Sequence, residues 1–168
     1  MARAIIITGG NLDNVKARLR QAQQMINERL GVILRCSHMY ESEAWGFTAS
    51  DNFLNQAIEL DTDLTPEELL QGVQAIEKEL GRDRTAEAAI KAANGEAYSS
   101  RKIDIDILFY DDKVISTPEL IIPHPLMHER DFVLAPLSEI APSKIHPIFD
   151  KTVRELRGEL HARQSMEK

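Results

Sequence analysis

Apolar residues recur along this chain at two spacings, and these spacings predict its strands and helices. Runs and alternations of aliphatic residues predict four strands, over residues 4–8, 32–40, 52–60 and 103–110. Apolar residues three and four positions apart predict two helices, one from residues 11–14 to a C-terminal cap at Gly31 and one over residues 65–80. Thr65-Pro66-Glu67-Glu68 begins the second helix with an N-cap, a proline at the first helical position and a capping-box glutamate.

The order strand, helix, strand, strand, helix, strand is typical of one fold class. It predicts an α+β protein with the βαββαβ order of ferredoxin-like folds, in which both helices cover one face of an antiparallel sheet. The proline-rich chain after Tyr110 is predicted to form short helices within residues 125–140 and 152–160, which cover part of the other face and leave a cleft. We expect a single domain over residues 1–168, with its core over residues 4–160 and a frayed C-terminal tail. Loops are expected over residues 41–51 and 82–100.

Charge and composition narrow the classes of partner. The 168 residues include 27 acidic and 20 basic side chains, for a net charge of −7. An acidic chain is unlike a dedicated nucleic-acid binder, although net charge says nothing about a local pocket for a small anion. The single cysteine, Cys36, excludes an internal disulfide, and the apolar runs are too short for a signal peptide or a membrane span. We therefore expect a cytoplasmic monomer without nucleic-acid or membrane partners.

Two acidic residues interrupt the fourth predicted strand. Alternation places Asp104 and Asp106 on one face, about 7 Å apart, and the isoleucines around them on the other face. Aspartate is disfavoured in strands, and Mg²⁺ prefers carboxylate oxygens completed by substrate phosphates. The pair is either a metal site or ordinary surface carboxylates, and the pattern alone leaves both interpretations open.

Several basic residues lie near that strand in the sequence. Arg82, Arg84 and Arg101 flank the long loop before it, and guanidinium groups suit phosphate oxygens. His124, held between two prolines, is able to donate to a phosphate or a leaving group, and Arg130 follows it. Each alone has a plain structural interpretation, as solvated arginine or a turn histidine. Beside the acidic pair they indicate a triphosphate site.

The third predicted strand carries residues suited to a flat heterocycle. Phe53 and Asn55 share one face of it, opposite the face of Leu54, Ile58 and Leu60. An aromatic ring beside an amide would suit a heterocycle, although a half-buried sheet position explains both residues equally simply. Thr8-Gly9-Gly10 lacks both glycine-rich phosphate-binding patterns, so we interpret it as a structural turn.

These segments together resemble a known family. They occur in one order, namely Thr8-Gly9-Gly10-Asn11-Leu12, Phe53-Leu54-Asn55, Gly81-Arg82-Asp83-Arg84, Arg101-Lys102-Ile103-Asp104-Ile105-Asp106-Ile107, and Ile122-Pro123-His124-Pro125 with Glu129-Arg130-Asp131-Phe132. From about residue 4 to residue 160 the chain is similar to the 6-hydroxymethyl-7,8-dihydropterin pyrophosphokinases of folate biosynthesis. The resemblance implies transfer of diphosphate from ATP to the pterin hydroxymethyl group, with release of AMP.

The resemblance also implies roles for individual residues. Asp104 and Asp106 would hold two Mg²⁺ ions. The pterin would bind between Phe53 and Phe132, with Asn55, Ser42, Ala44 and Trp45 at its edge. The phosphates and the rest of ATP would contact Arg82, Arg101, His124, Arg130, Arg84, Gln74, Glu77, Tyr98 and Ile107. Catalysis would depend on Arg82, Arg101, Asp104, Asp106, His124 and Arg130.

The chain also departs from the family pattern, and other functions stay open at this point. Gly10 stands where the family usually has serine, and Tyr98-Ser99-Ser100 replaces the usual tryptophan and Gly-Pro pair. The alternatives are a non-enzymatic ferredoxin-like binding module and a different ATP-dependent small-molecule kinase. Calorimetry with an ATP analogue and Mg²⁺ distinguishes the pyrophosphokinase from the binding module. A panel of substrates distinguishes it from another small-molecule kinase.

Overall fold

The computed structural model describes residues 1–11, 14–42, 53–81 and 103–166. Its main sheet contains β1 (Ala2–Gly10), β2 (Val32–Cys36), β3 (Tyr40–Ser42), β4 (Phe53–Thr62) and β5 (Asp104–Tyr110). Helices α1 (Val15–Arg29) and α2 (Pro66–Glu79) precede β5 in the chain. After β5 follow β6 (Ile115–Ser116), β7 (Ile121–Ile122), the 3₁₀ helix η1 (Met127–Glu129), α4 (Asp131–Ile140), β8 (Ile145–His146), β9 (Lys151–Thr152) and α5 (Val153–Met166).

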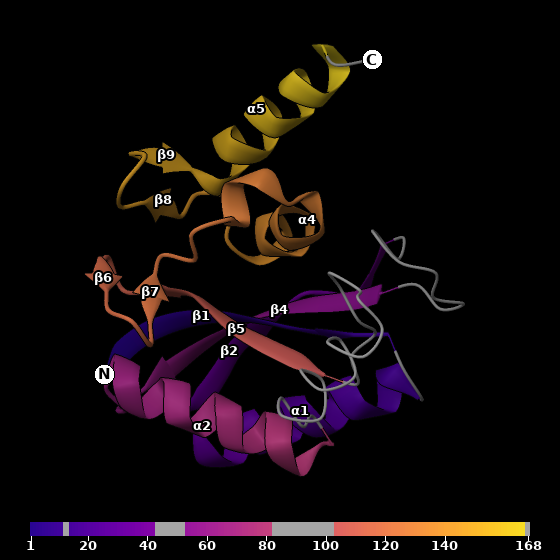
Figure 1. The fold of residues 1–168 in the computed structure, drawn as a ribbon, viewed down its shortest axis with the longest axis vertical. Coiled ribbons are helices and arrows are strands. Elements are labelled where there is room, and N and C mark those ends of the chain that lie inside the picture. Colours follow the sequence, from indigo (N-terminus) through magenta and orange to yellow (C-terminus); the bar gives the residue numbers. More distant parts are fainter. Residues whose placement is uncertain (12–13, 43–52, 82–102, 167–168) are drawn as a thin grey trace.

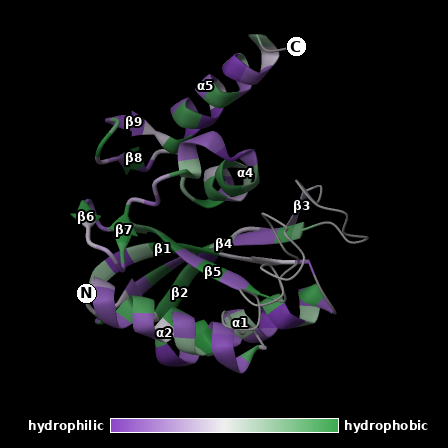
Figure 2. Ribbon diagram, in the orientation of Figure 1, coloured by the Kyte–Doolittle hydropathy of each residue, from purple (hydrophilic) through white to green (hydrophobic). Residues whose placement is uncertain are grey.

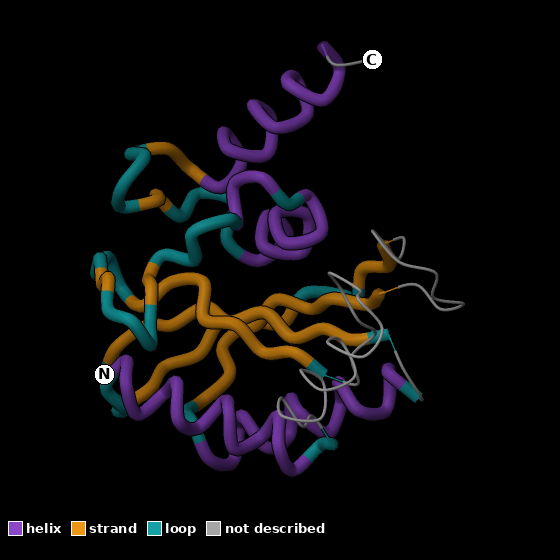
Figure 3. The backbone as a smooth tube through the Cα atoms, in the orientation of Figure 1, coloured by secondary structure: helices purple, strands orange, loops and turns teal. Residues whose placement is uncertain are grey.

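The strand order of the main sheet confirms the predicted fold class. The order is β2-β4-β1-β5, all described pairs are antiparallel, and β3 also pairs with β4. This is the ferredoxin-like arrangement, because the first strand of the chain lies between the third and the last of the four main segments. Helices α1 and α2 lie below the sheet in Figure 1, and α4 and α5 lie above it. Figure 3 shows the same layers by secondary structure.

The sheet is apolar on both faces, so it has two cores. On the α1 and α2 side, Ile6, Ile58 and Leu60 pack with residues such as Leu19 and Ile76. On the other side the core contains Ile5, Ile7, Ala57, Val133, Leu137 and Leu156. Figure 2 shows the apolar strands between these layers. The predicted assignment of Leu54, Ile58 and Leu60 to one face and Ala57 to the opposite face is confirmed.

One β-bulge changes the faces of the last sheet strand. In β5, Ile107 pairs with Ile6 and Phe109 pairs with Ile5, so Leu108 is an extra residue. Leu108 and Phe109 therefore both pack in the core under α4, whereas Tyr110 packs on the α2 side. The strict alternation predicted for residues 103–110 is wrong beyond Ile107.

Other element boundaries also differ from the predictions. The first strand does not end at residue 8 but includes Gly9 and Gly10, and α1 begins only at Val15, after Asn14 with a left-handed φ of 53°. The predicted strand over residues 32–40 is interrupted: β2 ends at Cys36, β3 begins at Tyr40, and between them the Ser37 hydroxyl accepts the Ala57 N–H (2.9 Å). Glu41 and Ser42, predicted as loop, belong to β3, and α5 extends six residues beyond the predicted residue 160.

The second helix has the ends that the sequence predicts. Thr65 Oγ1 accepts the Glu68 N–H (3.2 Å) and the Glu68 carboxylate accepts the Thr65 N–H (2.9 Å), which is a capping box. Gly81 follows the helix with a left-handed φ of 103°. Gly31 has no such φ. Its N–H nevertheless donates to the Ile26 carbonyl in the last turn of α1 (3.3 Å), and the Asp61 carbonyl occupies the space that a β-carbon would need.

Candidate active site

Strand β5 places two carboxylates beside each other on the α4 side of the sheet. Ile105 and Ile107 are buried on the opposite side, so Asp104 and Asp106 share the face that also carries Ile7. Asp106 pairs with Ile7 and Asp104 pairs with Gly9 of the neighbouring strand. Both carboxylates are partly buried, and a burial of this kind favours a positively charged partner.

A row of residues crosses the sheet at the level of Asp104. Asn55 on β4 and Asp104 on β5 flank Gly9 on β1 from its two sides, so all three positions face the same way. A side chain on Gly9 would collide with Asn55 Oδ1, which means that the Asn55 amide occupies the space that glycine leaves open. Asn55 is only 9% exposed, and its Nδ2 atom has no hydrogen-bond partner among the residues that the structure describes. Native proteins leave few buried donors unpaired, so this atom indicates a ligand acceptor.

The neighbouring strand ends bring further predicted residues to this row. Ser42 of β3 pairs with Phe53 of β4, and Tyr40 pairs with Asn55. Phe53 faces the same way as Asn55, because the two residues are two positions apart in one strand. Ser42, Phe53 and Asn55 therefore lie together at one end of the sheet, close to the end of β5 that carries Asp104.

A cleft of about 290 Å³ opens beside the outer edge of β5. Its wall includes the side of α2 at Gln74, the strand residues Asp106 and Ile107, and His124. The segment of residues 118–121 also lines the cleft. Three residues that the resemblance assigns to ATP, namely Gln74, Ile107 and His124, thus line one cleft with one of the two carboxylates.

His124 is fixed beside this cleft by its main chain and its ring. Its N–H donates to the Leu108 carbonyl (3.1 Å), and its Nδ1 accepts the Leu126 N–H (3.2 Å). Burial lowers the pKa of His124 below its ordinary value, the Arg130 charge lowers it further and the Asp104 carboxylate raises it. The ring is therefore neutral at pH 7, with its proton on Nε2 as a hydrogen-bond donor.

Arg130 and Phe132 lie at the start of α4. The Arg130 guanidinium lies 5.6 Å from the centre of the Phe132 ring, within range of a cation–π interaction. Phe132 is 42% exposed although it belongs to a helix that covers the sheet. An exposed ring beside a cation is a suitable platform for a flat, partly anionic ligand.

Glu77 is buried between α2 and β5. It is 2% exposed, and its Oε2 accepts the Ile105 N–H at 2.8 Å. This bond satisfies a main-chain donor at the outer edge of β5, between the two aspartates. Glu77 therefore helps to hold the acidic strand in place, whereas Gln74, one turn earlier on α2, faces the cleft.

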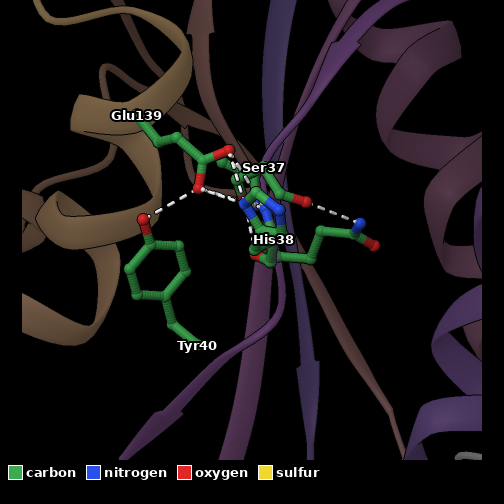
Figure 4. A network of polar contacts seen from close by, with 6 residues as sticks. Ser37, His38, Tyr40 and Glu139 are labelled. Atoms are coloured by element: carbon green, nitrogen blue, oxygen red, sulfur yellow. Dashed lines mark hydrogen bonds and ion pairs between the residues drawn. The ribbon is translucent and has the colours of Figure 1, made fainter.

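A polar network that the sequence did not predict ties α4 to β3 (Figure 4). The Glu139 carboxylate accepts hydrogen bonds from the His38 N–H (3.1 Å) and from Tyr40 Oη (2.8 Å), and it contacts His38 Nδ1 (3.1 Å). Tyr40 is the cross-strand neighbour of Asn55. The network therefore supports the strand that pairs with β4 at Phe53 and Asn55. Its only sequence signal is a polar residue near the end of an apolar helix.

Replacing Glu139 by glutamine should make the protein less stable at pH 7 than at low pH, relative to wild type. Partial burial raises the pKa of Glu139, but hydrogen bonds from Tyr40 and His38 hold it below its ordinary value. A carboxylate with a lowered folded pKa contributes stability above its unfolded pKa and loses it as pH falls through the folded pKa. We expect a loss of about 1 kcal/mol at pH 7 that vanishes as the pH falls through the lowered folded pKa, measured by urea unfolding. Glu119→Gln, on an exposed surface, is the control, and an equal loss at both pH values would contradict the prediction.

Some predicted site residues lie outside the described residues. They are Ala44, Trp45, Arg82, Arg84, Tyr98 and Arg101, and both predicted loops fall almost entirely there as well. Within the described ranges, no group of three or more histidine, cysteine, aspartate or glutamate residues is arranged to hold a metal ion. None of the helices in the same ranges is both long and apolar enough to cross a membrane.

The fold and the site define a ferredoxin-like α+β protein with a carboxylate pair, a histidine and an arginine gathered at one end of its sheet beside a cleft. Residues 5–142 match the family described as 7,8-dihydro-6-hydroxymethylpterin-pyrophosphokinase (HPPK). Because the match extends over most of the chain, the protein belongs to this family.

Curated relatives agree with this assignment. A protein of Aquifex aeolicus named 2-amino-4-hydroxy-6-hydroxymethyldihydropteridine pyrophosphokinase is 39% identical over 159 residues, which are 95% of this chain and 92% of the relative. A protein of the same name from Porphyromonas gingivalis is 41% identical over 148 residues, covering 88% of this chain and 95% of the relative. The Bacillus subtilis protein of that name is 40% identical over 138 residues, which are 82% of this chain and 77% of the relative.

Solved structures support the fold. The chain superimposes on the crystal structure of Plasmodium falciparum HPPK-DHPS wild type with pteroate with a TM-score of 0.77 at 15% identity. It superimposes on HPPK-DHPS in complex with substrates with a TM-score of 0.73 at 17% identity. The alignments cover 98% and 99% of this chain but only 45% and 44% of those chains, so this chain spans less than half of their length.

Proposed function

We propose that this protein transfers diphosphate from ATP to the hydroxymethyl group of 6-hydroxymethyl-7,8-dihydropterin and releases AMP, a step of folate biosynthesis. The observation that carries the proposal is the row Asn55, Gly9 and Asp104. It joins an amide with a buried, unpaired donor to the acidic strand that borders the cleft. A heterocycle held by the amide would present its substituent toward the carboxylates.

The pterin would lie between the rings of Phe53 and Phe132. Asn55 Nδ2 would donate to an acceptor of the pterin, which would satisfy the buried amide. Ser42 lies beside Phe53 in the sheet and would complete the edge of this pocket with Ala44 and Trp45. Aromatic stacking and amide recognition fit a flat, polar ring system.

The nucleotide would enter the cleft between α2 and the segment of residues 118–121. Gln74 and Ile107 would contact it directly, and Glu77 would act through the Ile105 main chain. His124 Nε2–H and the Arg130 guanidinium would bind the phosphates. From the sequence we assign further contacts with the phosphates and the nucleotide to Arg82, Arg84, Tyr98 and Arg101.

Asp104 and Asp106 suit a hard divalent cation, because they are two partly buried carboxylates on one strand face. We propose that they hold two Mg²⁺ ions. When bound, Mg²⁺ neutralises the charge of the transferring phosphates and aligns them. The pterin hydroxyl oxygen bonds to the β-phosphorus, the bond from that phosphorus to the α-phosphate oxygen breaks, and AMP departs. Arg130 and His124 would stabilise the charge on the phosphate oxygens, and Asp106 would be one candidate acceptor of the hydroxyl proton.

We further propose that the chain acts as a single pyrophosphokinase domain. It would work as a cytoplasmic monomer that takes small-molecule substrates and no nucleic acid. The acidic net charge of −7 and the single cysteine support this proposal.

Purified protein should form AMP from ATP only when both the pterin alcohol and Mg²⁺ are present. The expected products are AMP and the pterin diphosphate in equal amounts, measured by chromatography. A panel of other small alcohols and amines serves as the control for substrate class. ADP in place of AMP, or AMP formed equally without the pterin, would contradict the proposed function.

A further inference from the structure

Helix α5 follows the residues that match the family, yet it contacts the segment that carries two proposed site residues. The family match ends at residue 142, and α5 extends from Val153 to Met166. Its apolar residues Val153, Leu156 and Leu160 are buried in the same core as Val133 and Leu137 of α4. The helix is therefore fixed against α4.

The polar side of α5 reaches the first residue of α4. Arg157 Nε donates to Asp131 Oδ1 at 3.0 Å, and His161 Nε2 lies 2.8 Å from the same oxygen. Arg157 and His161 are four residues apart, so they project from one face of α5. Further along the helix, Arg163 donates to the His128 carbonyl at 3.4 Å. Side chains of α5 thus hold the chain on both sides of Arg130.

The start of α4 lacks the usual local support. Arg130 is its N-cap residue, with φ −123° and ψ 104°, and no side chain caps the helix there. Asp131 is the acidic residue of the first turn, where a carboxylate stabilises the helix dipole. Partial burial raises the pKa of Asp131, but hydrogen bonds from Arg157 and His161 hold it below its ordinary value. The carboxylate is therefore ionised and bound to α5 at neutral pH.

Asp131 lies between the two residues on which the proposed function depends at this end of the site. Arg130 precedes it and Phe132 follows it. The Arg130 guanidinium carbon lies 5.6 Å from the centre of the Phe132 ring. A rotation of the first turn of α4 would displace the guanidinium and the ring together.

We infer that α5 is a positioning element of the active site, in which Arg157 and His161 hold Asp131 and thereby fix Arg130 and Phe132 toward the two substrates. This inference rests on the proposed function, because Arg130 and Phe132 receive their roles there. Arg157, His161 and Asp131 do not touch substrate. Their contribution is the orientation of the residues that do.

The test compares Arg157→Gln/His161→Gln with Arg154→Gln, a change on the same helix at a residue whose side chain makes no polar contact with residues that the structure describes. We expect the KM values for ATP and for the pterin to rise about three- to tenfold in the double variant, with kcat less affected, because the ion pairs are partly exposed. The control should keep both KM values. Arg157→Lys, with His161 unchanged, should keep KM values much closer to those of the wild type than Arg157→Gln does.

A second readout does not depend on catalysis. Hydrogen exchange of the amides of residues 130–134 should be faster in the double variant than in the control. If the double variant does not fold, Asp131→Asn, which keeps the size of the side chain, is measured by the same criteria. A lower melting temperature with unchanged KM values and unchanged exchange at residues 130–134 would overturn the inference. An inactive wild-type protein would instead contradict the proposed function, and the exchange experiment would still decide the role of α5.

Discussion

Replacing either Asp104 or Asp106 by asparagine should lower the rate of diphosphate transfer by about a thousandfold or more. The two carboxylates share one strand face beside the cleft, so each change removes one hard, charged oxygen ligand from the proposed Mg²⁺ site. An amide keeps the shape of the side chain and a weak oxygen donor. The loss should therefore appear in kcat at saturating substrates and should not be restored by excess Mg²⁺.

The same substitutions should leave the fold intact, because asparagine keeps the size and shape of each partly buried side chain. The free energy of unfolding should change by less than about 1 kcal/mol, measured by urea unfolding in EDTA. Asp112→Asn is the control, since that carboxylate is 84% exposed just beyond β5 and pairs with Lys144. Near-normal turnover by either active-site variant would disprove the metal assignment.

The sequence predicted most of the architecture because its signals were local. The capping box at Thr65 and Glu68 and the alternation of Asp104 and Asp106 with isoleucine each depend on residues a few positions apart. The βαββαβ order then followed from the order of the elements. The same alternation predicted that the two carboxylates share one strand face, and only the structure shows that this face lies on the side of the sheet away from α2.

The features that the sequence did not predict depend on residues far apart in the chain. The bulge at Leu108 exists only in relation to Ile5 and Ile6 on the opposite strand. Glu139 meets Tyr40 across 99 positions, so no local pattern links them. Likewise, glycines usually end strands, and nothing near Gly9 indicated that the side chain of Asn55 lies against it.

The structure shows Gly9 as a strand residue that contacts the side chain of Asn55, and not as the structural turn that the sequence predicted. Its α-carbon lies against the Asn55 amide, whose Nδ2 atom is buried without a hydrogen-bond partner in the described part of the chain. Burying an unpaired donor costs about 1–3 kcal/mol, which a bound heterocycle with an acceptor would recover. Part of the binding free energy for such a heterocycle would therefore come from a side chain on a rigid strand and not from a loop.

Gly9→Ala should weaken pterin use about a hundredfold in kcat/KM, with a much smaller effect on the KM for ATP. The new methyl group would collide with Asn55 Oδ1 and would lie 3.1 Å from the Leu54 carbonyl, so the amide must move. Gly158→Ala is the matched control, because nothing lies within 4 Å of a Cβ atom there and alanine favours its helix. Steady-state kinetics with each substrate varied separately, together with melting temperatures, measure the effect.

A double-mutant cycle with Asn55→Ala identifies the cause of that loss. If Gly9→Ala acts by displacing the amide, it has little left to displace once Asn55 is alanine, so the double variant should be about as active as Asn55→Ala alone. If the methyl group instead distorts β1 and moves Asp104, the two losses should multiply, and the KM for ATP should rise as well. Strongly non-additive losses of kcat/KM for the pterin, with an unchanged KM for ATP, would establish that Gly9 acts through the position of the Asn55 amide. Fully additive losses would show that the glycine serves only the packing of the strand.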